Sequence, residues 1–181
     1  MRIVAGTWRG RALVAPPGQV TRPTADRVRQ ALFDMLLHAP WGGRGVLEGA
    51  RVLDAFAGTG ALGLEALSRG AAFATFIEQD RGALEALRRN VATCRAGAQS
   101  AVLAMDVLAA LQGEPCGVVF LDPPYGQTLV PRAVARLRAM GWIAPEALVV
   151  VETGRDEALP ELGEQLAERA HSAARVSVWR A

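Results

Sequence analysis

The fold of this chain is decided at residues 51–63 by the stretch RVLDAFAGTGALG. Its apolar start, as far as Phe56, predicts a buried strand within a parallel sheet. Gly58 and Gly60 predict a sharp turn that leaves no side chain between the backbone and a ligand. The residues that follow predict a helix that stops at Gly70. A strand, a glycine turn and a helix in this order are typical of a nucleotide-type cofactor site at the carboxyl end of a strand.

Two acids near this turn narrow the choice of cofactor. The spacing of Gly58, Gly60 and Gly63 fits the dinucleotide pattern G-x-G-x-x-G, although a glycine turn that serves only the fold would look the same. Glu78 closes the next strand-like run about 20 residues after Gly58, where an acid meets ribose hydroxyls in both NAD and S-adenosylmethionine sites. Asp54 favours S-adenosylmethionine, because a pyrophosphate needs a helix N-terminus free of nearby negative charge.

Composition limits the class of protein. The chain has 181 residues, 51% of them hydrophobic, which is most simply one domain with a full core. Its apolar runs are shorter than the roughly 18 residues of a membrane helix, and we see no apolar block of a signal peptide, so we expect a soluble, cytoplasmic protein. Cys94 and Cys116 are too few and too far apart for a disulfide framework or a zinc motif, and His38 and His171 are isolated. We therefore expect no metal site.

The charge of the chain is unevenly distributed. All 20 basic residues are arginine. Residues 1–30 carry a net charge of +5, whereas residues 31–181 carry a net charge of −3. A basic end on a mildly acidic body favours docking of a polyanion at that end. A solvated basic tail would give the same counts, so charge alone leaves both interpretations open.

The basic end also has its own pattern. Residues 1–15 predict two short strands around a turn that carries Trp8. Arginines beside an indole fit nucleic acid, since guanidinium binds phosphate and indole stacks on an unpaired base, but Trp8 could equally only anchor the hairpin. A helix with Thr24 as its N-cap is predicted next. The arginines at its start oppose the helix dipole and so favour an anionic partner, although an ion pair with Asp26 would explain part of this. The nucleic-acid-binding candidates are Arg2, Trp8, Arg9, Arg11, Arg22, Thr24, Arg27 and Arg29.

From residue 51 onward strand-like and helix-like runs alternate, which is the pattern of a doubly wound sheet. The expected elements are helices at 80–94 and 131–140, strands at 101–103, 117–121 and 147–151, an acidic loop at 154–165 and a terminal antiparallel hairpin at 166–171 and 175–180.

The most specific chemical signal is Asp122-Pro123-Pro124-Tyr125, at the end of a buried strand. The two prolines fix the backbone, so the chain leaves the strand as a rigid arm. Asp122 and a proline carbonyl can accept hydrogen bonds from an exocyclic amine, and Tyr125 offers a flat face to a base. Such acceptors direct the amine lone pair toward a methyl group, and the carboxylate tolerates the proton that is released. A proline turn that only caps the strand is the alternative.

In order and spacing, Val52–Gly63, Glu78, Asp106 and Asp122–Tyr125 resemble the motifs of class I S-adenosylmethionine-dependent amino-methyltransferases. With residues 6–11 and 22–29 included, the whole chain resembles the bacterial 16S ribosomal RNA guanine-N2 methyltransferases of the RsmD type. This resemblance implies an α/β, Rossmann-like fold with a mostly parallel seven-stranded sheet and an antiparallel C-terminal hairpin.

The resemblance also implies an organisation and a set of roles. A small N-terminal hairpin and helix, residues 1–40, would bind RNA, and residues 41–181 would form the methyltransferase domain of a monomer. The loop and Asp54 would hold the methionine part of S-adenosylmethionine, Glu78 the ribose, and Asp106 with Val107 the adenine. A flipped guanine would be held by Asp122, Pro123, Pro124 and Tyr125, with ribosomal RNA gripped by the N-terminal arginines. The implied cofactor residues are Asp54, Phe56, Ala57, Gly58, Thr59, Gly60, Glu78, Gln79, Asp106 and Val107.

Four other functions remain as alternatives. A DNA adenine methyltransferase would share Asp122–Tyr125, but we see no separate target-recognition segment in so short a chain. A glutamine-directed protein methyltransferase usually has Asn where this chain has Asp122. A non-catalytic RNA-binding assembly factor would not need both motifs intact, and an NAD-dependent enzyme is disfavoured by Asp54.

Overall fold

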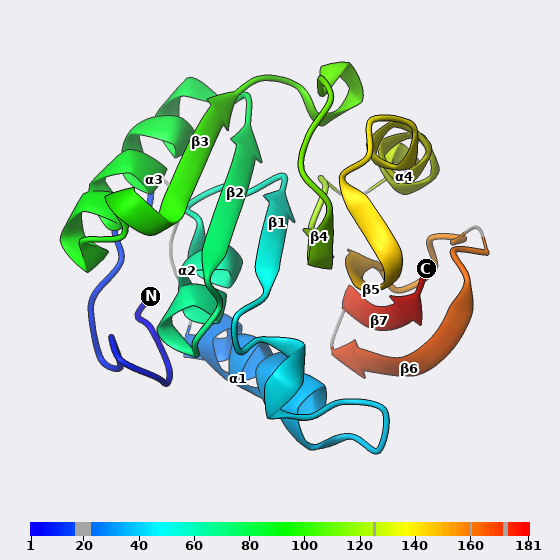
Figure 1. Cartoon of the computed structure of the whole chain (residues 1–181), viewed down its shortest axis with the longest axis horizontal. Helices are drawn as coiled ribbons and strands as arrows, with labels where there is room; N and C mark the ends of the chain where they lie inside the picture. Colours follow the sequence, from blue (N-terminus) through cyan, green and yellow to red (C-terminus); the bar gives the residue numbers. More distant parts are fainter. Residues whose placement is uncertain (17–22, 125, 160, 172–173) are drawn as a thin grey trace.

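The computed structural model describes residues 1–16, 23–124, 126–159, 161–171 and 174–181 of the chain (Figure 1). Arg22 and Tyr125, two of the candidate site residues, therefore lie outside the described residues, as does the side chain of Thr24.

A seven-stranded mixed sheet forms the centre of the described chain, in the order β3-β2-β1-β4-β5-β7-β6. Strands β1 to β5 are parallel, and β7 runs antiparallel between β5 and β6. The expected doubly wound sheet with a terminal antiparallel hairpin is therefore confirmed. The strands are β1 (Arg51–Ala55), β2 (Phe73–Glu78), β3 (Ser100–Ala104), β4 (Cys116–Leu121), β5 (Ile143–Gly154), β6 (Glu164–His171) and β7 (Ala174–Arg180).

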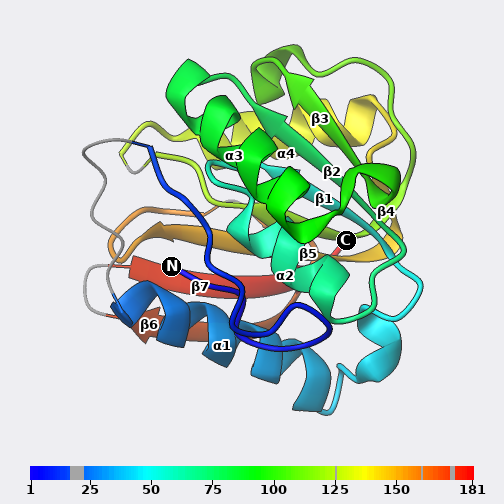
Figure 2. The ribbon, with the colours of Figure 1, turned by 90° about the vertical axis from the view of Figure 1, so that its left-hand side faces the viewer.

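Helices cover both faces of the sheet. Figure 2 shows α1, α2 and α3 in front of the strands and α4 behind them. The α-helices are α1 (Pro23–His38), α2 (Ala61–Ser68), α3 (Arg81–Cys94) and α4 (Leu129–Ala139), and the short 3-10 helices are η1 (Arg44–Val46), η2 (Gly97–Gln99) and η3 (Val107–Ala109).

The two faces of the sheet carry two apolar cores because neighbouring side chains of a strand point to opposite sides. Along β4, Val118 and Phe120 pack with residues of α1, α2 and α3, whereas Val119 and Leu121 pack with residues of α4. The first core also contains Ile3 and other residues of the N-terminal segment. The N-terminal segment is thus packed into the same body as the sheet.

Some boundaries differ from the sequence expectation. β5 extends over Ile143–Gly154 rather than 147–151, because β7 pairs with it as far as Gly154. The predicted N-terminal strand pair is reduced to a single bridge between Arg2 and Ala12, with backbone bonds around it.

The prediction of Thr24 as the N-cap of α1 is wrong, since the helix begins one residue earlier at Pro23. Proline suits a first helical position, where its missing N–H has no partner to lose.

Candidate active site

The glycine loop follows β1 and has an unusual backbone. Phe56, which we expected to lie in the strand, instead follows it in the left-handed region with φ 66°, and Gly58 and Gly60 have φ 55° and 77°. A bulky residue in this region is strained, and such strain gathers at functional sites. The loop is held by hydrogen bonds from Ala57 N to Ile77 O (3.0 Å) and from Gly60 N to Ala57 O (2.7 Å). Ala57 is buried and Thr59 half-buried.

Gly63 shows why the third glycine of the pattern is needed. A Cβ at this position would lie 2.4 Å from the Phe76 ring and 3.2 Å from Asp54 Oδ2. The Gly63 N–H donates to Asp54 Oδ2 at 2.8 Å, so α2 lies directly against the end of β1. Asp54 itself is 1% exposed and lies beneath the loop.

Glu78 holds the loop from the neighbouring strand. Its Oε2 accepts from Gly58 N at 2.7 Å, and its Oε1 accepts from Gln79 N at 2.8 Å and Asp80 N at 2.7 Å. The carboxylate therefore lies beside the glycine loop at the carboxyl end of β2, where we expected a ribose-binding acid. Gln79 is exposed next to it.

Asp106 and Val107 follow β3 at the same edge of the sheet. The Asp106 carboxylate caps η3 by accepting from Leu108 N at 2.9 Å and stays half-buried. Val107 is 3% exposed and packs in the core on the α4 side. Of this pair, Asp106 is the residue with accessible side-chain surface.

The proline arm leaves β4 beside the glycine loop. In the pairing of β1 with β4, Asp54 lies opposite Phe120 and Ala55 opposite Leu121, so Phe56 and Asp122 follow neighbouring strand ends. Pro123 is buried, whereas Asp122 and Pro124 are exposed. The glycine loop and the proline arm therefore follow neighbouring strands at the same edge of the sheet.

Acids gather on one side of this edge. Asp54, Glu78 and Glu152 each lie two positions after a core residue, namely Val52, Phe76 and Val150, and so share its side of the strand. These three core residues pack on the face of the sheet that α1, α2 and α3 cover. Asp122 continues the same alternation after Phe120. Glu152 was not predicted as a site residue, although its place at the end of a buried strand could have indicated it.

Burial, together with neighbouring acids, raises the pKa of Asp54 and of Asp122. Burial raises the pKa of Asp54 to about 7; the hydrogen bond from Gly63 opposes this rise and the charge of Glu78 adds to it. Asp122 keeps accessible surface, yet the protein around it removes enough water to raise its pKa to about 8, with further increases from the charges of Glu152 and Asp54. Negative charge is disfavoured here without a partner, so the site favours a cation.

The N-terminal arginines do not all face solvent. Arg2, Arg9 and Arg27 are exposed. Arg11 is half-buried, and its guanidinium donates to Thr93 O at the end of α3 (2.7 Å).

The prediction of Arg29 as a nucleic-acid contact is wrong. Its side chain is 5% exposed and lies 3.0 Å from Asp26 and 3.6 Å from Glu65, itself completely buried. It also donates to the carbonyl of Arg2. The alternative of an ion pair with Asp26 is confirmed for this arginine.

Trp8 is half-buried and packs against the core, while its backbone N–H donates to Ser68 Oγ at 2.9 Å. These contacts fit the anchoring interpretation of Trp8. The stacking role stays a prediction.

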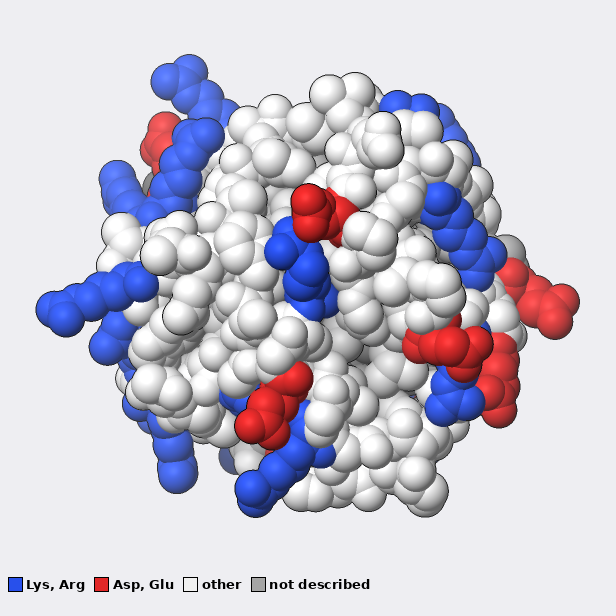
Figure 3. All heavy atoms as spheres, in the orientation of Figure 1, with Lys and Arg blue, Asp and Glu red and all other residues white. Residues whose placement is uncertain are grey.

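The contact of Arg11 with α3 creates a basic surface that the sequence did not suggest. Figure 3 shows arginines along the side of the molecule that α3 occupies in Figure 1. We call this the arm–α3 surface, where the arm is the N-terminal segment, residues 1–16, and not the proline arm after β4. Its exposed or half-exposed arginines are Arg9, Arg11, Arg88, Arg89 and Arg95.

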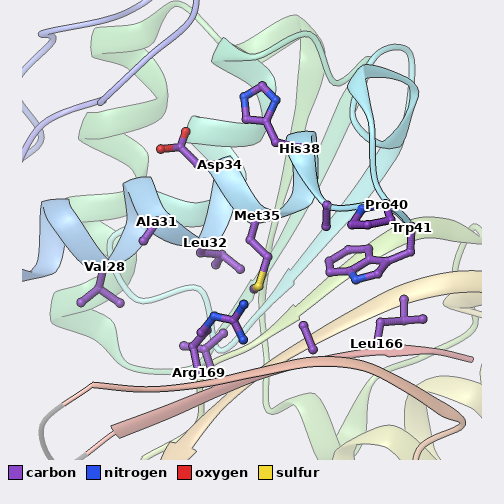
Figure 4. Close-up of a pocket in the computed structure, with 13 residues that line it drawn as sticks. Val28, Ala31, Leu32, Asp34, Met35, His38, Pro40, Trp41, Leu166 and Arg169 are labelled. Atoms are coloured by element: carbon purple, nitrogen blue, oxygen red, sulfur yellow. The ribbon is translucent and has the colours of Figure 1, made fainter.

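A large open groove lies elsewhere. It encloses about 560 Å³ and is lined mainly by apolar residues of α1, the segment after it, β6 and β7, with Met35, Trp41 and Leu166 among them (Figure 4). None of its lining residues is a site candidate, so the groove is separate from the chemistry described above.

Within the described residues, no helix is both long and apolar enough to cross a membrane. The same residues contain no group of three or more His, Cys, Asp or Glu side chains placed to hold a metal ion.

The chain is similar to known proteins over nearly its whole length. A family model described as "Conserved hypothetical protein 95" matches residues 1–179. Ribosomal RNA small subunit methyltransferase D of Escherichia coli K12 is 47% identical over 162 residues, which is 88% of this chain and 78% of that protein. The Haemophilus influenzae protein of the same name is 39% identical over 164 residues, covering 88% and 81%.

A solved structure agrees with these relatives. The Escherichia coli protein yhhF has a TM-score of 0.84 and 40% identity, covering 99% of this chain and 97% of that one. The Rossmann-like class I methyltransferase fold is therefore confirmed. The chain belongs to the Conserved hypothetical protein 95 family, the family of the RsmD-type ribosomal RNA small subunit methyltransferases.

Proposed function

We propose that this protein transfers a methyl group from S-adenosylmethionine to the exocyclic N2 amine of a guanine in 16S ribosomal RNA. The observation that carries the proposal is the meeting of the glycine loop and the Asp122-Pro123-Pro124 arm at one edge of the sheet. The names of the relatives support the class of reaction and the ribosomal RNA substrate.

The residues present fit the proposed cofactor. Among the described residues nothing lies within 4 Å of a Cβ built at Gly58, so a ligand can approach the loop backbone there. The acids Asp54, Asp122 and Glu152 favour a cation, and S-adenosylmethionine carries an ammonium and a sulfonium. Glu78 and Asp106 would hold its ribose and adenine. When bound, this cofactor supplies an electrophilic methyl group.

Asp122 would then orient the substrate. Its carboxylate accepts hydrogen bonds from the guanine amine and so directs the amine lone pair toward the methyl group. The nitrogen gains a carbon and must release one proton. A bound cation favours the ionised form of Asp122, and this carboxylate can take the proton because its pKa is raised to about 8. The rigid prolines hold the acceptor in place, and the guanine reaches it by leaving its stack.

RNA would bind along the arm–α3 surface. The surface combines exposed arginines from the N-terminal residues with arginines of α3, and guanidinium groups bind phosphates without reading sequence. In this proposal residues 1–40 serve as the RNA-binding extension, and α3 adds to them.

A methyl-transfer assay tests the proposal. The protein is incubated with S-adenosylmethionine carrying a labelled methyl group and with 16S ribosomal RNA, small ribosomal subunits or duplex DNA. We expect label in N2-methylguanine from ribosomal RNA or subunits. Preferential methylation of duplex DNA, or no label in guanine, would overturn the proposal.

A further inference from the structure

Asn90 on α3 joins two segments that lie far from it in sequence. Its side chain is 1% exposed. Its Oδ1 accepts from Val14 N at 2.8 Å, and its Nδ2 donates to Val14 O at 3.0 Å and to Thr59 O at 2.9 Å. Both amide hydrogens are therefore used, one on each segment.

One of these segments is a strap, residues 11–16, that runs along α3. Arg11 contacts Thr93 near the end of α3, and Val14 contacts Asn90. Pro16 reaches the first turn, because a Cβ built at Gly82 would lie 3.9 Å from Pro16 Cβ. Figure 2 shows this blue segment rising beside α3. The strap therefore runs from the arm–α3 surface toward the end of β2 that carries Glu78.

The other segment is the cofactor loop itself. Thr59 lies between Gly58 and Gly60, both with positive φ. Asn90 binds the Thr59 carbonyl while Glu78 binds the Gly58 N–H, so two side chains fix this short loop from outside. A single buried amide thus fixes both the proposed cofactor loop and the strap that continues from the proposed RNA surface.

We propose that Asn90 is a positioning residue that couples cofactor binding to RNA binding. A ligand that fixes Thr59 also fixes the amide that holds Val14, so each ligand favours the arrangement that the other needs. Such coupling is reciprocal by thermodynamic necessity. The inference rests on the proposed function, because it takes S-adenosylmethionine and ribosomal RNA as the two ligands.

The test measures the dissociation constant of S-adenosylhomocysteine with and without a saturating 16S ribosomal RNA transcript. For the wild-type protein we expect the RNA to tighten binding about fivefold or more. Val14→Pro removes the N–H that Asn90 Oδ1 accepts but leaves Asn90 and Thr59 in place. We expect this variant to keep its affinity for S-adenosylhomocysteine alone and to lose the enhancement. Asn90→Ala, which also releases the Thr59 carbonyl, should lose the enhancement too.

Ser68→Ala is the matched control. Ser68 Oγ accepts from Trp8 N and donates to Ala5 O, so this variant loosens the same N-terminal arm without touching Thr59. A merely structural role for Asn90 would make all three variants lower stability and RNA affinity alike and leave the enhancement unchanged. We expect Ser68→Ala to keep the enhancement.

The outcomes separate the two proposals. Wild-type protein that binds neither S-adenosylhomocysteine nor the transcript contradicts the proposed function. Binding of both without enhancement, or an undiminished enhancement in Val14→Pro, overturns the coupling alone. Val14 is 45% exposed, so its variant decides the question even where Asn90→Ala does not fold.

Discussion

Asp122 follows β4 and shares its side of the sheet with Asp54 and Glu152. Removal of water by the surrounding protein raises its pKa most, and the charges of Glu152 and Asp54 raise it further. Its surroundings therefore hold a carboxyl whose proton affinity suits exchange near neutral pH. At the scale of the residue, the proposed chemistry depends on this side chain more than on any other.

Replacing Asp122 by Ala should lower the turnover number by on the order of a hundredfold or more, because the acceptor that orients the amine is lost. RNA affinity should stay within about twofold, since phosphate contacts dominate it. Single-turnover methyl transfer and a filter-binding assay check the two expectations. An alanine variant with wild-type turnover would remove Asp122 from the mechanism.

Cofactor affinity should depend on pH. The pKa of Asp54 is raised to about 7 and that of Asp122 to about 8, and a cationic ligand binds their ionised forms. Affinity for S-adenosylmethionine should therefore rise between pH 6 and about pH 9 and then level off. Titration calorimetry across this range checks it. In the control variant Asp54→Asn, which can still accept from Gly63, the rise should be weaker and centred nearer pH 8.

The raised pKa of Asp54 makes the stability of the ligand-free protein change with pH in the opposite direction to cofactor affinity. The folded protein keeps a proton on Asp54 up to about pH 7, while an unfolded chain loses it near pH 3.8. The free energy of unfolding of the ligand-free protein should therefore fall as pH rises through this window. Denaturant unfolding at several pH values checks this. Between pH 5 and 8 the wild-type protein should lose stability relative to Asp54→Asn, and a wild-type protein that gains stability relative to this variant would contradict the expectation.

At the scale of the elements, α2 is placed by close contact with the sheet. Gly63→Ala would put a Cβ within 2.4 Å of Phe76, so we expect a loss of about 1–3 kcal/mol in the free energy of unfolding. Gly117→Ala in β4 is the control, because no atom of the part of the chain that the structure describes lies within 4 Å of a Cβ there. Urea unfolding of both variants measures the difference, and equal stability would mean that α2 can shift to make room.

Glu65 on α2 fixes the N-terminal arm. Its completely buried carboxylate accepts from Val4 N at 2.8 Å, Ala5 N at 3.0 Å and Arg69 Nε at 2.8 Å, and lies 3.6 Å from Arg29 Nε. Glu65→Ala would leave buried arginines without their partner, so we expect a loss of about 3–5 kcal/mol. Glu85→Ala on the exposed side of α3 should change stability by less than about 0.5 kcal/mol. Chemical denaturation compares them, and a small loss for Glu65→Ala would contradict this role.

At the scale of the whole molecule, arginines lie along the side that α3 occupies in Figure 1, as the face shown in Figure 3 makes visible. The arm–α3 surface lies on the side of α1, α2 and α3, whereas α4 covers the opposite face. If RNA binds along the arm–α3 surface, replacing an exposed arginine there should weaken RNA binding more than replacing one on the α4 side.

Replacing Arg9 and Arg89 by Gln should weaken binding of 16S ribosomal RNA and reduce the slope of log affinity against log salt by about 1.5, since two phosphate contacts are lost. The exposed Arg132 on α4 is the control, and Arg132→Gln should change neither quantity. Binding titrations at several salt concentrations check both. If Arg132→Gln weakened RNA binding as much as the replacement of Arg9 and Arg89, RNA would bind through the overall positive charge and not through the arm–α3 surface.

Much of the backbone around the candidate site could be predicted because it depends on neighbouring residues. Three features directly follow strand-like runs in the sequence and could be recognised for that reason. They are the glycines after β1, the acid at the end of β2 and the Asp122-Pro123-Pro124 arm after β4. The left-handed backbone of Phe56 could not be predicted from its apolar side chain, because it belongs to a loop that is held to β2 by the hydrogen bond from Ala57 N to Ile77 O. Arg29 was misjudged since its partner Glu65 lies 36 positions away on another helix.

By itself the sequence determined the alternation of strands and helices, the glycine loop and the proline arm, because each depends on backbone preferences and hydrophobic patterns of neighbouring residues. Only the tertiary structure decided which arginines remain exposed, how Glu152 joins the other acids, and that Asn90 links Val14 to Thr59. Those outcomes depend on strand order and helix packing, which bring together side chains whose separation along the chain carries no signal of their contact.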